Sequence, residues 1–452
     1  MKKFSFFALG VILVGAGTIY FLLQREIGLK TVNFISNQLS DQSTEKETIS
    51  VKTETPTSTL AGISTTTEQA TTTKPSTDTT SVQTPPSEKN TTGIPLKLPS
   101  GFSISVYAKN VYGARVLRMA PDGNLWVSLK GLGQLAALVD ADNDGVAERV
   151  QIMVRGLNIP HGFAFRCLSE IQCELYVGEM NQVSRFAVTK NGSSLSIGAK
   201  ETVLSLPSGG HQTRTLIFLP AASGETREHR LLISVGSTCD LCIESDTRRG
   251  TIQVLDVDSG ESSTYASGLR NAVFQAIHPL TKAVWVTEMG SDHMGDGIPP
   301  DEINILVEGK NYGWPICYGK NIHNTTFDHN TYIRAPCSDP FEVGSYIDIP
   351  AHSAPLGLAF VPGLVWGDEY ANDVLVAYHG SSKRSQLTGY KIVRMKLDST
   401  GNYFGTEDFI TGWQHGSRPE DAYGRPVDIL IQSDGVMFIS DDKVGQVYRI
   451  TH

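Results

Sequence analysis

Several features are scarce or missing in this 452-residue chain, and each absence narrows its class. Charged residues make up only 19% of the sequence, and acidic residues outnumber basic ones to give a formal net charge of −9. A protein that binds nucleic acid needs a basic patch, so this balance argues against such a partner. Long stretches with helical periodicity are also missing after residue 94. With 43 glycines and 21 prolines, the composition predicts many short strands joined by turns.

Aromatic residues are absent between Asn37 and Ile94. This stretch consists mainly of Ser, Thr, Glu, Lys and Pro, which cannot bury enough apolar surface to offset the entropy lost on ordering. The sequence therefore predicts a disordered, stalk-like linker over residues 31–94. The folded domain is expected over residues 95–452.

The N-terminus carries an apolar run. Lys2 and Lys3 precede an uncharged stretch from Phe4 to Leu23, which is long enough to cross a bilayer as a helix. A cleaved signal peptide is the alternative, but its apolar region is shorter, about 7–15 residues, and no A-x-A-like cleavage site follows this run. We therefore expect an N-terminal transmembrane helix within residues 1–30, an uncleaved signal anchor that holds the folded domain on the extracytoplasmic side.

Six cysteines lie after residue 94 and form three local couples: Cys167 with Cys173, Cys239 with Cys242, and Cys317 with Cys337. An even number of cysteines outside the membrane predicts disulfide bonds, while the sequence alone does not fix which cysteines pair. A redox or metal site is the alternative for the Cys239-x-x-Cys242 pair. A zinc site needs a second such pair, which the sequence lacks, and Ile243 stands where a c-type haem site requires His. A structural disulfide is the favoured interpretation.

A theme of two apolar stretches around a turn recurs along the folded part. It begins at five positions: Val116, Thr215, Val273, Leu356 and Val427. One more module is expected between His161 and Val188. Four-stranded modules repeated at spacings of tens of residues are typical of propellers, so the sequence predicts an all-β fold, a six-bladed β-propeller. The last strand, 445–450, and the strand near Phe102 are expected to share a blade and close the ring.

The loops on one face of a propeller converge on its central channel. By their positions in the modules, the residues expected there are His161, His211, Arg270, Asn271, Ser353, Arg384 and Arg425. Several cations around one mouth of an acidic protein predict an anionic ligand held by carboxylate pairing. The alternative for each arginine is a bond to a loop carbonyl or to a neighbouring carboxylate.

Two stretches are candidates for cation binding. Residues 140–145, Asp-Ala-Asp-Asn-Asp-Gly, place oxygen ligands at alternate positions and Gly at the turn, as calcium loops do. Gln151 stands where an EF-hand places its bidentate Glu, and no flanking helices are predicted, so a bare Asx-type hairpin turn is the alternative. Glu302, near Asp301 and Tyr312, is the second candidate for an oxygen-ligated ion.

Eight motifs follow one another in the folded part: GGHQTRTLIF, SVGSTCDLC, GLRNAVF, PPDEIN, GKNYGWPICYG, AHSAPLGLAF, HGSSKRSQLTGYKIVR and GRPVDIL. Together they resemble the glucose/sorbosone dehydrogenase family of soluble-type quinoproteins, nearest to its sorbosone-dehydrogenase-like branch. The resemblance covers about residues 95–452. It implies an enzyme that uses pyrroloquinoline quinone (PQQ) and calcium to oxidise a hydroxyl of an aldose or related sugar or polyol. The electrons would pass to an external acceptor, which is a quinone, a cytochrome or another carrier.

The resemblance also implies roles for individual residues. His211 matches the general base that takes the hydroxyl proton, and Asp301 matches a carboxylate that supports the site. The residues matched to cofactor contacts are Arg270, Asn271, Arg425 and either Lys383 or Arg384. Asn158 or His161 is expected near the reacting hydroxyl, and His161 is counted among the cofactor-binding candidates. The residues matched to calcium ligands are Gly290, Ser291, Glu302 and Tyr312, the last two at a second, structural ion.

Three departures from the glucose-oxidising members bear on cofactor affinity and substrate. Ser291 replaces a Pro, Val427 replaces a second Arg, and the inserted stretch Asp292–Pro299 is expected to reshape the substrate mouth. Two other functions are weighed. A non-catalytic, surface-displayed binding propeller is disfavoured because His211 and Arg270 are retained. A lactonase-like hydrolase needs carboxylates around a central metal, whereas the channel set is cationic. The expected partners are a sugar or polyol, the electron acceptor, the membrane and a second copy in a homodimer.

Overall fold

The structure is a computed structural model that describes residues 89–338 and 342–452. The expected transmembrane segment, 1–30, lies outside these residues, as does the expected linker up to residue 88. Within the described part of the chain, no helix is long and apolar enough to cross a membrane. The last residues of the expected linker do carry structure, because β1 (Lys89–Asn90) pairs with β2 (Ser103–Lys109) in parallel.

Within the described residues, the sheets include six blades of a propeller, which confirms the predicted fold class. The first two blades consist of β3 (Ala114–Met119), β4 (Leu125–Leu129), β5 (Gln134–Val139) and β6 (Arg149–Val154), then β7 (Phe163–Cys167), β8 (Gln172–Glu179), β9 (Gln182–Asn191) and β10 (Ser194–Ser205). The third and fourth consist of β11 (Leu216–Phe218), β12 (Arg230–Val235), β13 (Thr251–Asp256) and β14 (Ser262–Ser267), then β15 (Ala272–Ile277), β16 (Val284–Glu288), β17 (Asp301–Leu306) and β20 (Ile347–Ile349). The fifth consists of β21 (Pro355–Phe360), β22 (Val374–Tyr378), β23 (Lys391–Leu397) and β24 (Tyr403–Ile410).

The sixth blade joins the two ends of the described chain. Strands β25 (Pro426–Ile431), β26 (Met437–Asp441) and β27 (Gln446–Thr451) come from the C-terminus, and β2 pairs antiparallel with β27, Ser103 opposite Thr451. This confirms the predicted closure of the ring. Closure pairs edges that would otherwise expose unpaired backbone groups.

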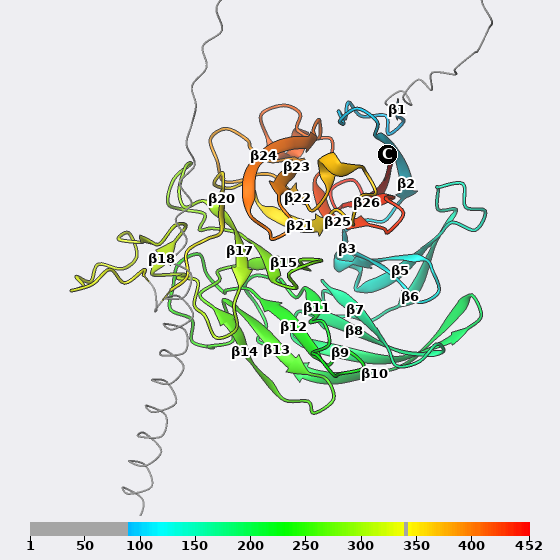
Figure 1. Ribbon diagram of the computed structural model, residues 1–452, viewed down its shortest axis with the longest axis horizontal. Coiled ribbons are helices and arrows are strands. Elements are labelled where there is room, and N and C mark those ends of the chain that lie inside the picture. The colour runs from blue at the N-terminus through cyan, green and yellow to red at the C-terminus, as the bar shows by residue number, and fades with distance from the viewer. Residues whose placement is uncertain (1–88, 339–341) are drawn as a thin grey trace, which may run out of the picture. The chain divides into compact units, whose positions relative to one another are not determined.

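The innermost strands of the blades form a closed ring, as Figure 1 shows. Each of β3, β7, β11, β15, β21 and β25 contacts the innermost strand of the next blade. The segments that enter these strands all approach the channel from one face. Side chains at or just before the strand starts, such as Arg115, Arg270 and Arg425, therefore converge there.

Both faces of a blade are buried against neighbouring blades, so the strands are apolar on both sides. In β16, Val284 and Val286 belong to the apolar cluster between the third and fourth blades. Trp285, between them in sequence, points the other way and packs edge-on against Tyr346 and Phe360, with ring centroids 5.2 and 5.4 Å away. Because successive side chains of a strand point to opposite faces, β16 contributes to the packing on both faces of its blade.

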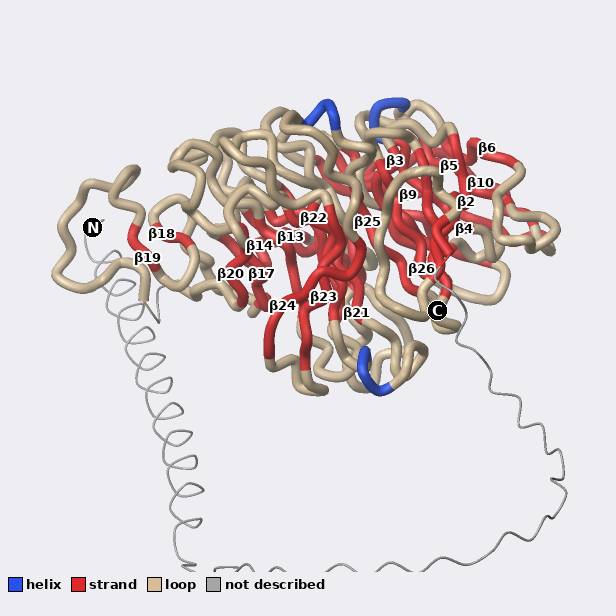
Figure 2. Tube along the Cα trace, turned by 90° about the horizontal axis from the view of Figure 1, so that it is seen from above, coloured by secondary structure: helices blue, strands red, loops and turns tan. Residues whose placement is uncertain are grey.

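The loops carry three further features. The described residues contain three short 3₁₀ helices: Lys130–Leu132, Asp368–Tyr370 and Pro419–Asp421. A hairpin of β18 (Cys317–Tyr318) and β19 (Ile322–His323) lies in a lobe beside the propeller strands (Figure 2). All three predicted cysteine couples are disulfides: Cys167–Cys173, Cys239–Cys242 and Cys317–Cys337.

Candidate active site

The loops that enter the innermost strands surround a cavity of about 220 Å³ at one mouth of the channel. Five residues predicted for the site line it: His211, Arg270, Asp301, Lys383 and Arg425. They come from the third to sixth blades, so residues more than 200 positions apart meet at one surface. Gly290, another predicted residue, also lines this cavity.

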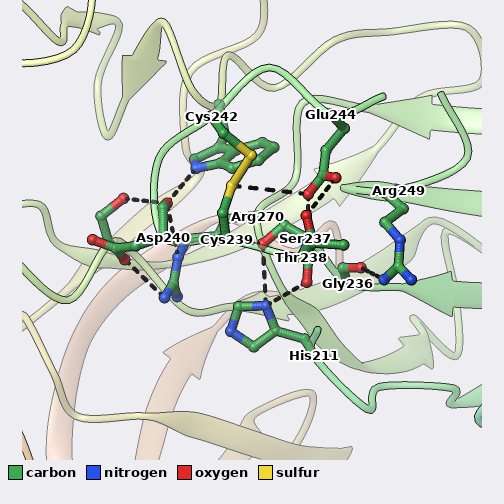
Figure 3. Close-up of a disulfide and its surroundings, with 12 residues drawn as sticks. His211, Gly236, Ser237, Thr238, Cys239, Asp240, Cys242, Glu244, Arg249 and Arg270 are labelled. Atoms are coloured by element: carbon green, nitrogen blue, oxygen red, sulfur yellow. Dashed lines mark hydrogen bonds and ion pairs between the residues drawn. A yellow bond between two sulfur atoms is a disulfide. The ribbon is translucent and has the colours of Figure 1, made fainter. Parts of the chain in front are cut away.

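Contacts with Ser237 fix the tautomer of His211. Its Nδ1 lies 2.9 Å from the Ser237 carbonyl oxygen and 3.1 Å from the Ser237 hydroxyl (Figure 3). A carbonyl can only accept, so Nδ1 carries the proton and Nε2 is left with its lone pair. Nε2 has no hydrogen-bond partner among the described residues. Burial, together with the charge of Arg270, lowers the pKa of His211, so the ring is neutral near pH 7.

The close packing behind His211 requires a glycine. A Cβ built on Gly236 would lie 2.6 Å from the His211 Cβ and 2.7 Å from the Asn271 Oδ1. Those distances are shorter than non-bonded carbon contacts allow. Gly236 therefore lets the strand that ends at Val235 pass directly behind the imidazole.

Arg270 is one of the most heavily bonded side chains at the cavity, and it is only 4% exposed. Its Nη1 donates to the carbonyl oxygens of Met289 and Gly290, at 3.3 and 2.7 Å. Its Nε donates to the Asp240 carbonyl oxygen at 3.2 Å, and its Nη2 lies 2.9 Å from carboxylates of both Asp240 and Asp292. Each guanidinium nitrogen thus has a protein partner.

Asn271, the next residue, lies behind the cavity wall. The Thr213 hydroxyl donates to its Oδ1 at 2.7 Å, and its backbone N–H donates to Glu288 at 3.0 Å. Its amide nitrogen lies 3.4 Å from the Met289 sulfur. Asn271 is 4% exposed and does not line the cavity, so its contacts lock the turn into β15.

Asp301 joins two segments of the cavity wall. Its two carboxylate oxygens accept the backbone N–H groups of Gly290 and Ala354, at 2.9 and 2.8 Å. Burial raises its pKa to about 7, although those two hydrogen bonds act in the opposite direction. Asp301 therefore fixes the spacing between the two wall segments that contain Gly290 and Ala354.

The cations on the opposite wall include donors free for an anion. Arg425 donates to the carbonyl oxygens of His379 and Gly380, at 3.1 and 2.5 Å, and its Nη1 has no partner within the described residues. Lys383 is exposed and lines the cavity, whereas Arg384 lies outside the lining and donates to the Ala351 carbonyl. The structure thus places Lys383, not Arg384, at the cavity.

His161 and Val427, like Asn271 and Arg384, do not line this cavity. His161 is 1% exposed in the channel and does not line the cavity; its Nε2 lies 3.3 Å from Arg115 and its Nδ1 3.2 Å from the Thr215 hydroxyl. Val427, at the position where the resemblance expects a second arginine, is fully buried in the apolar core. An arginine at that point of β25 would face apolar side chains.

Sequence reasoning missed a polar chain beside the channel. Arg115 pairs with Asp442 at 2.9 Å, and Asp442 accepts a hydrogen bond from His379 at the same distance. Burial lowers the pKa of His379 to about 4, against the effect of Asp442. Arg115 is the second residue of β3, the first innermost strand, and by register it corresponds to Val273 and Val427. Its place directly before the apolar stretch that begins at Val116 was the signal that could have found it.

The residues matched to calcium ligands occupy two different settings. The Gly290 carbonyl already accepts a hydrogen bond from the cationic Arg270, which disfavours a second cation on the same oxygen. Ser291 is buried and its hydroxyl donates to Asp240. A second, small cavity of about 20 Å³ is lined by Gly290, Ser291, Glu302 and Tyr312, together with Glu288.

Glu288 and Glu302 lie opposite each other on β16 and β17, and both are buried. Burial, and the charge of Glu302, raise the pKa of Glu288 well above its usual value, and burial raises that of Glu302 to about 7. The Glu288 Oε2 is a buried atom without a hydrogen-bond partner in the described chain. The Tyr312 hydroxyl, by contrast, is bonded to Ile305 and Val307. A cation therefore fits the two carboxylates better than the Tyr312 hydroxyl.

The acidic turn 140–145 brings oxygen ligands together at the rim of the first blade. Single carboxylate oxygens of Asp140, Asp142, Asp144 and Glu148 lie within 4.8 Å of one another. Glu148, rather than Gln151, completes this group. Hydrogen bonds within the turn, such as Gly145 N–H to Asp140, match the Asx-turn alternative equally well, so calcium binding here stays a prediction.

The family described as TrAA12-like matches residues 96–452. The chain belongs to the TrAA12-like family. This confirms the resemblance drawn from the motifs. A relative in Borreliella burgdorferi, an uncharacterized protein, is 28% identical over 365 residues, which cover 78% of this chain and 90% of that protein.

Solved structures of the same fold come from fungi and bacteria. The calcium structure of a Trichoderma reesei carbohydrate-active enzyme of family AA12 has a TM-score of 0.66 and 20% identity, over 80% of this chain and 99% of that one. The holo PQQ domain of Coprinopsis cinerea pyranose dehydrogenase has a TM-score of 0.64 and 18% identity, over 80% and 100%. The PQQ-bound aldose sugar dehydrogenase of Streptomyces coelicolor has a TM-score of 0.54 and 18% identity, over 78% and 99%.

Proposed function

We propose that this TrAA12-like protein is a PQQ- and calcium-dependent oxidoreductase that oxidises a hydroxyl of an aldose or related sugar or polyol, with His211 as the general base. The observation that carries the proposal is the tautomer of His211. Its Nδ1 is fixed on the Ser237 carbonyl, so Nε2 is an unbonded acceptor on a residue that lines a cation-rimmed cavity. The PQQ-bound and calcium structures with the same fold support the choice of cofactors.

The side chains at the cavity suit PQQ, which is a tricarboxylate. Lys383 and the free Nη1 of Arg425 would pair with its carboxylates. When bound, PQQ supplies a quinone that accepts a hydride. His211 Nε2 takes the proton of the sugar hydroxyl, and the Ser237 carbonyl steadies the imidazolium that forms. Asp301 keeps the 290 and 354 segments at their separation.

Calcium would be held by Glu288 and Glu302, with neighbouring carbonyls supplying more oxygens. The support is the unpartnered Glu288 Oε2 beside a second buried carboxylate. Two negative charges in one buried site repel, and a divalent cation would remove that cost. At this place the ion would stabilise the turn that carries Gly290 and Arg270.

We also propose that the enzyme is anchored in the membrane through residues 4–23 and faces the extracytoplasmic side. The three disulfides support an oxidising compartment. In that setting the electrons from the sugar would pass to a quinone, a cytochrome or another carrier outside the cytoplasm. A protease-accessibility assay on cells stripped of any outer envelope tests the orientation, and digestion of the propeller only after lysis of the cytoplasmic membrane would contradict it.

Steady-state dye reduction tests the activity itself. Purified protein with PQQ and calcium is expected to reduce a dye with at least one aldose or polyol from a panel. His211→Gln keeps the size of the side chain but removes the base, so kcat should fall by about 10²–10⁴-fold. A His211→Gln variant at the wild-type rate would exclude the base. Wild-type protein that binds sugars but reduces no dye would favour the non-catalytic binding propeller.

A further inference from the structure

Arg270 forms ion pairs with two carboxylates that differ in exposure and in their position relative to the cavity. Asp240 and Asp292 both lie 2.9 Å from its Nη2. The Asp240 side chain is 22% exposed and does not line the active-site cavity, whereas the Asp292 side chain is 39% exposed and does. The Arg270 guanidinium therefore contacts Asp240 on the side away from the cavity and Asp292 on the side that faces it.

Asp240 lies inside the ring that the Cys239–Cys242 disulfide closes, above His211 and Arg270 (Figure 3). Its carbonyl oxygen accepts bonds from Arg270 Nε, from Trp314 Nε1 at 3.1 Å and from the Ser291 hydroxyl at 3.3 Å. Its carboxylate accepts the Asp292 backbone N–H at 2.6 Å. One residue thus ties together the arginine, the aromatic turn and the start of the inserted stretch.

The same ring reaches His211 through a second contact. The Ser237 hydroxyl, which lies 3.1 Å from His211 Nδ1, donates to the Cys239 carbonyl at 2.7 Å. The disulfide restricts the backbone at both Cys239 and Asp240. The base and the arginine are therefore oriented by adjacent carbonyls of one short covalent ring.

The Asp292 side chain has fewer contacts than Asp240. Its carboxylate contacts Arg270, and it begins the inserted strap 292–299, which crosses beside the cavity. The far part of that strap is fixed separately, by His352 to the Gly295 carbonyl at 2.8 Å and by Asp296 to Ser385. The Asp292 carboxylate can therefore turn away from Arg270 without releasing the strap.

We propose that the Cys239–Cys242 ring positions Arg270 through Asp240 and His211 through the Cys239 carbonyl and Ser237. We also propose that Asp292 is an exchangeable counter-ion, which a carboxylate of a planar polycarboxylate ligand replaces on Arg270. The inference rests on the proposed function for the identity of that ligand as PQQ. It assigns Asp240 as a positioning residue and Asp292 as a determinant of cofactor affinity. It also gives the inserted strap a role in cofactor binding.

Calorimetric titration of calcium-loaded protein tests the exchange, with PQQ and benzene-1,3,5-tricarboxylate as separate probes. Asp292→Asn removes the competing anion, so the Kd for the probe should fall by about tenfold. Asp296→Asn removes one negative charge from the same strap without touching Arg270, and its Kd should stay within about twofold of wild type. An Asp292→Asn Kd that is unchanged or raised overturns the exchange.

Hydrogen–deuterium exchange tests the positioning without any cofactor. Cys239→Ser with Cys242→Ser should raise amide exchange in peptides that cover 208–214 and 288–297. The matched control, Cys167→Ser with Cys173→Ser, should raise it only near its own hairpin in the second blade. If the first variant does not fold, Asp240→Asn, which weakens the contacts of this carboxylate with Arg270 and the Asp292 N–H, carries the comparison for peptides that cover 288–297. Unchanged exchange in 288–297 overturns the positioning role.

The two readouts separate this inference from the proposed function. If benzene-1,3,5-tricarboxylate binds with the predicted order of affinities while PQQ does not, the inference stands and PQQ is not the cofactor. If neither probe binds wild type or Asp292→Asn, the exchange is refuted. If PQQ binds and sugar is oxidised but Asp292→Asn changes nothing, the proposed function stands and the exchange fails.

Discussion

Replacing Phe102 by Ala tests how the ring is held closed. Phe102 precedes β2, the strand that completes the last blade, and its side chain is fully buried. Its ring centroid lies 5.1 Å from Trp366, 5.0 Å from Phe409 and 4.5 Å from His452. These partners belong to the fifth blade and the C-terminus, so Phe102 joins the first strands of the described chain to the last.

The expected loss follows from this burial. Removing a fully buried Phe side chain forfeits about 1.5–3 kcal/mol of transfer free energy. The surrounding rings are fixed by their own contacts and cannot refill the space, so a cavity adds to the loss and the total is about 3–5 kcal/mol. Phe404→Ala is the matched control, because Phe404 is 71% exposed and its loss should stay within about 0.5 kcal/mol.

Equilibrium urea unfolding, followed by tryptophan fluorescence, measures both variants against wild type. The free energy of unfolding is obtained from the transition midpoint and the slope m. A loss below about 1 kcal/mol for Phe102→Ala would refute the idea that this contact holds the ring closed, since so small a loss is typical of partly exposed positions.

Three further predictions concern the site. Gly236→Ala should displace His211, lower kcat by about 10²-fold and cost about 1–3 kcal/mol of stability, because the added Cβ overlaps His211 and Asn271. Gly131→Ala, where a Cβ meets nothing within 4 Å, should leave kcat unchanged. Equal kcat values for the two variants would contradict the packing. Burial and the charge of Arg270 lower the pKa of His211, and the general base must be neutral to accept a proton. The value of kcat/KM should therefore fall on acidification with a midpoint below pH 6.5. A midpoint above pH 6.5 would exclude His211 as the general base. Glu288→Gln should abolish the rise in Tm that calcium produces. In a chelator the variant should be at least as stable as wild type, because it removes a buried carboxylate with an unpartnered oxygen. A calcium response like that of wild type would place the ion elsewhere.

The architecture could be predicted from the sequence because each blade repeats one local pattern. Apolar stretches flanking a turn recur at Val116, Val273 and Val427, and each starts in or just beyond the beginning of an innermost strand. The pairing of β2 with β27 was predictable as well, since a propeller needs closed edges. The sequence predicted disulfide bonds but left their connectivity open, and the structure pairs each cysteine with its nearest cysteine along the chain.

The site was only partly predictable because module position says which residues approach the channel and not which way they point. His211, Arg270 and Arg425 reach the cavity as expected. His161 also lies in a segment that enters an innermost strand, but it turns into the channel toward Arg115. Glu288 gave no signal, because its role depends on pairing across the sheet with Glu302. Such cross-strand neighbours are fixed by register, which the sequence alone does not supply.

The most direct test of the proposed function is the absorption spectrum of the purified protein titrated with PQQ in the presence of calcium. The account predicts saturable binding with a bound-quinone spectrum that bleaches when a reactive sugar is added. It also predicts that His211→Ala binds PQQ but does not bleach, because the cations remain and the base is gone. Absence of PQQ binding at micromolar concentrations with calcium present, or bleaching in His211→Ala at the wild-type rate, would contradict the account.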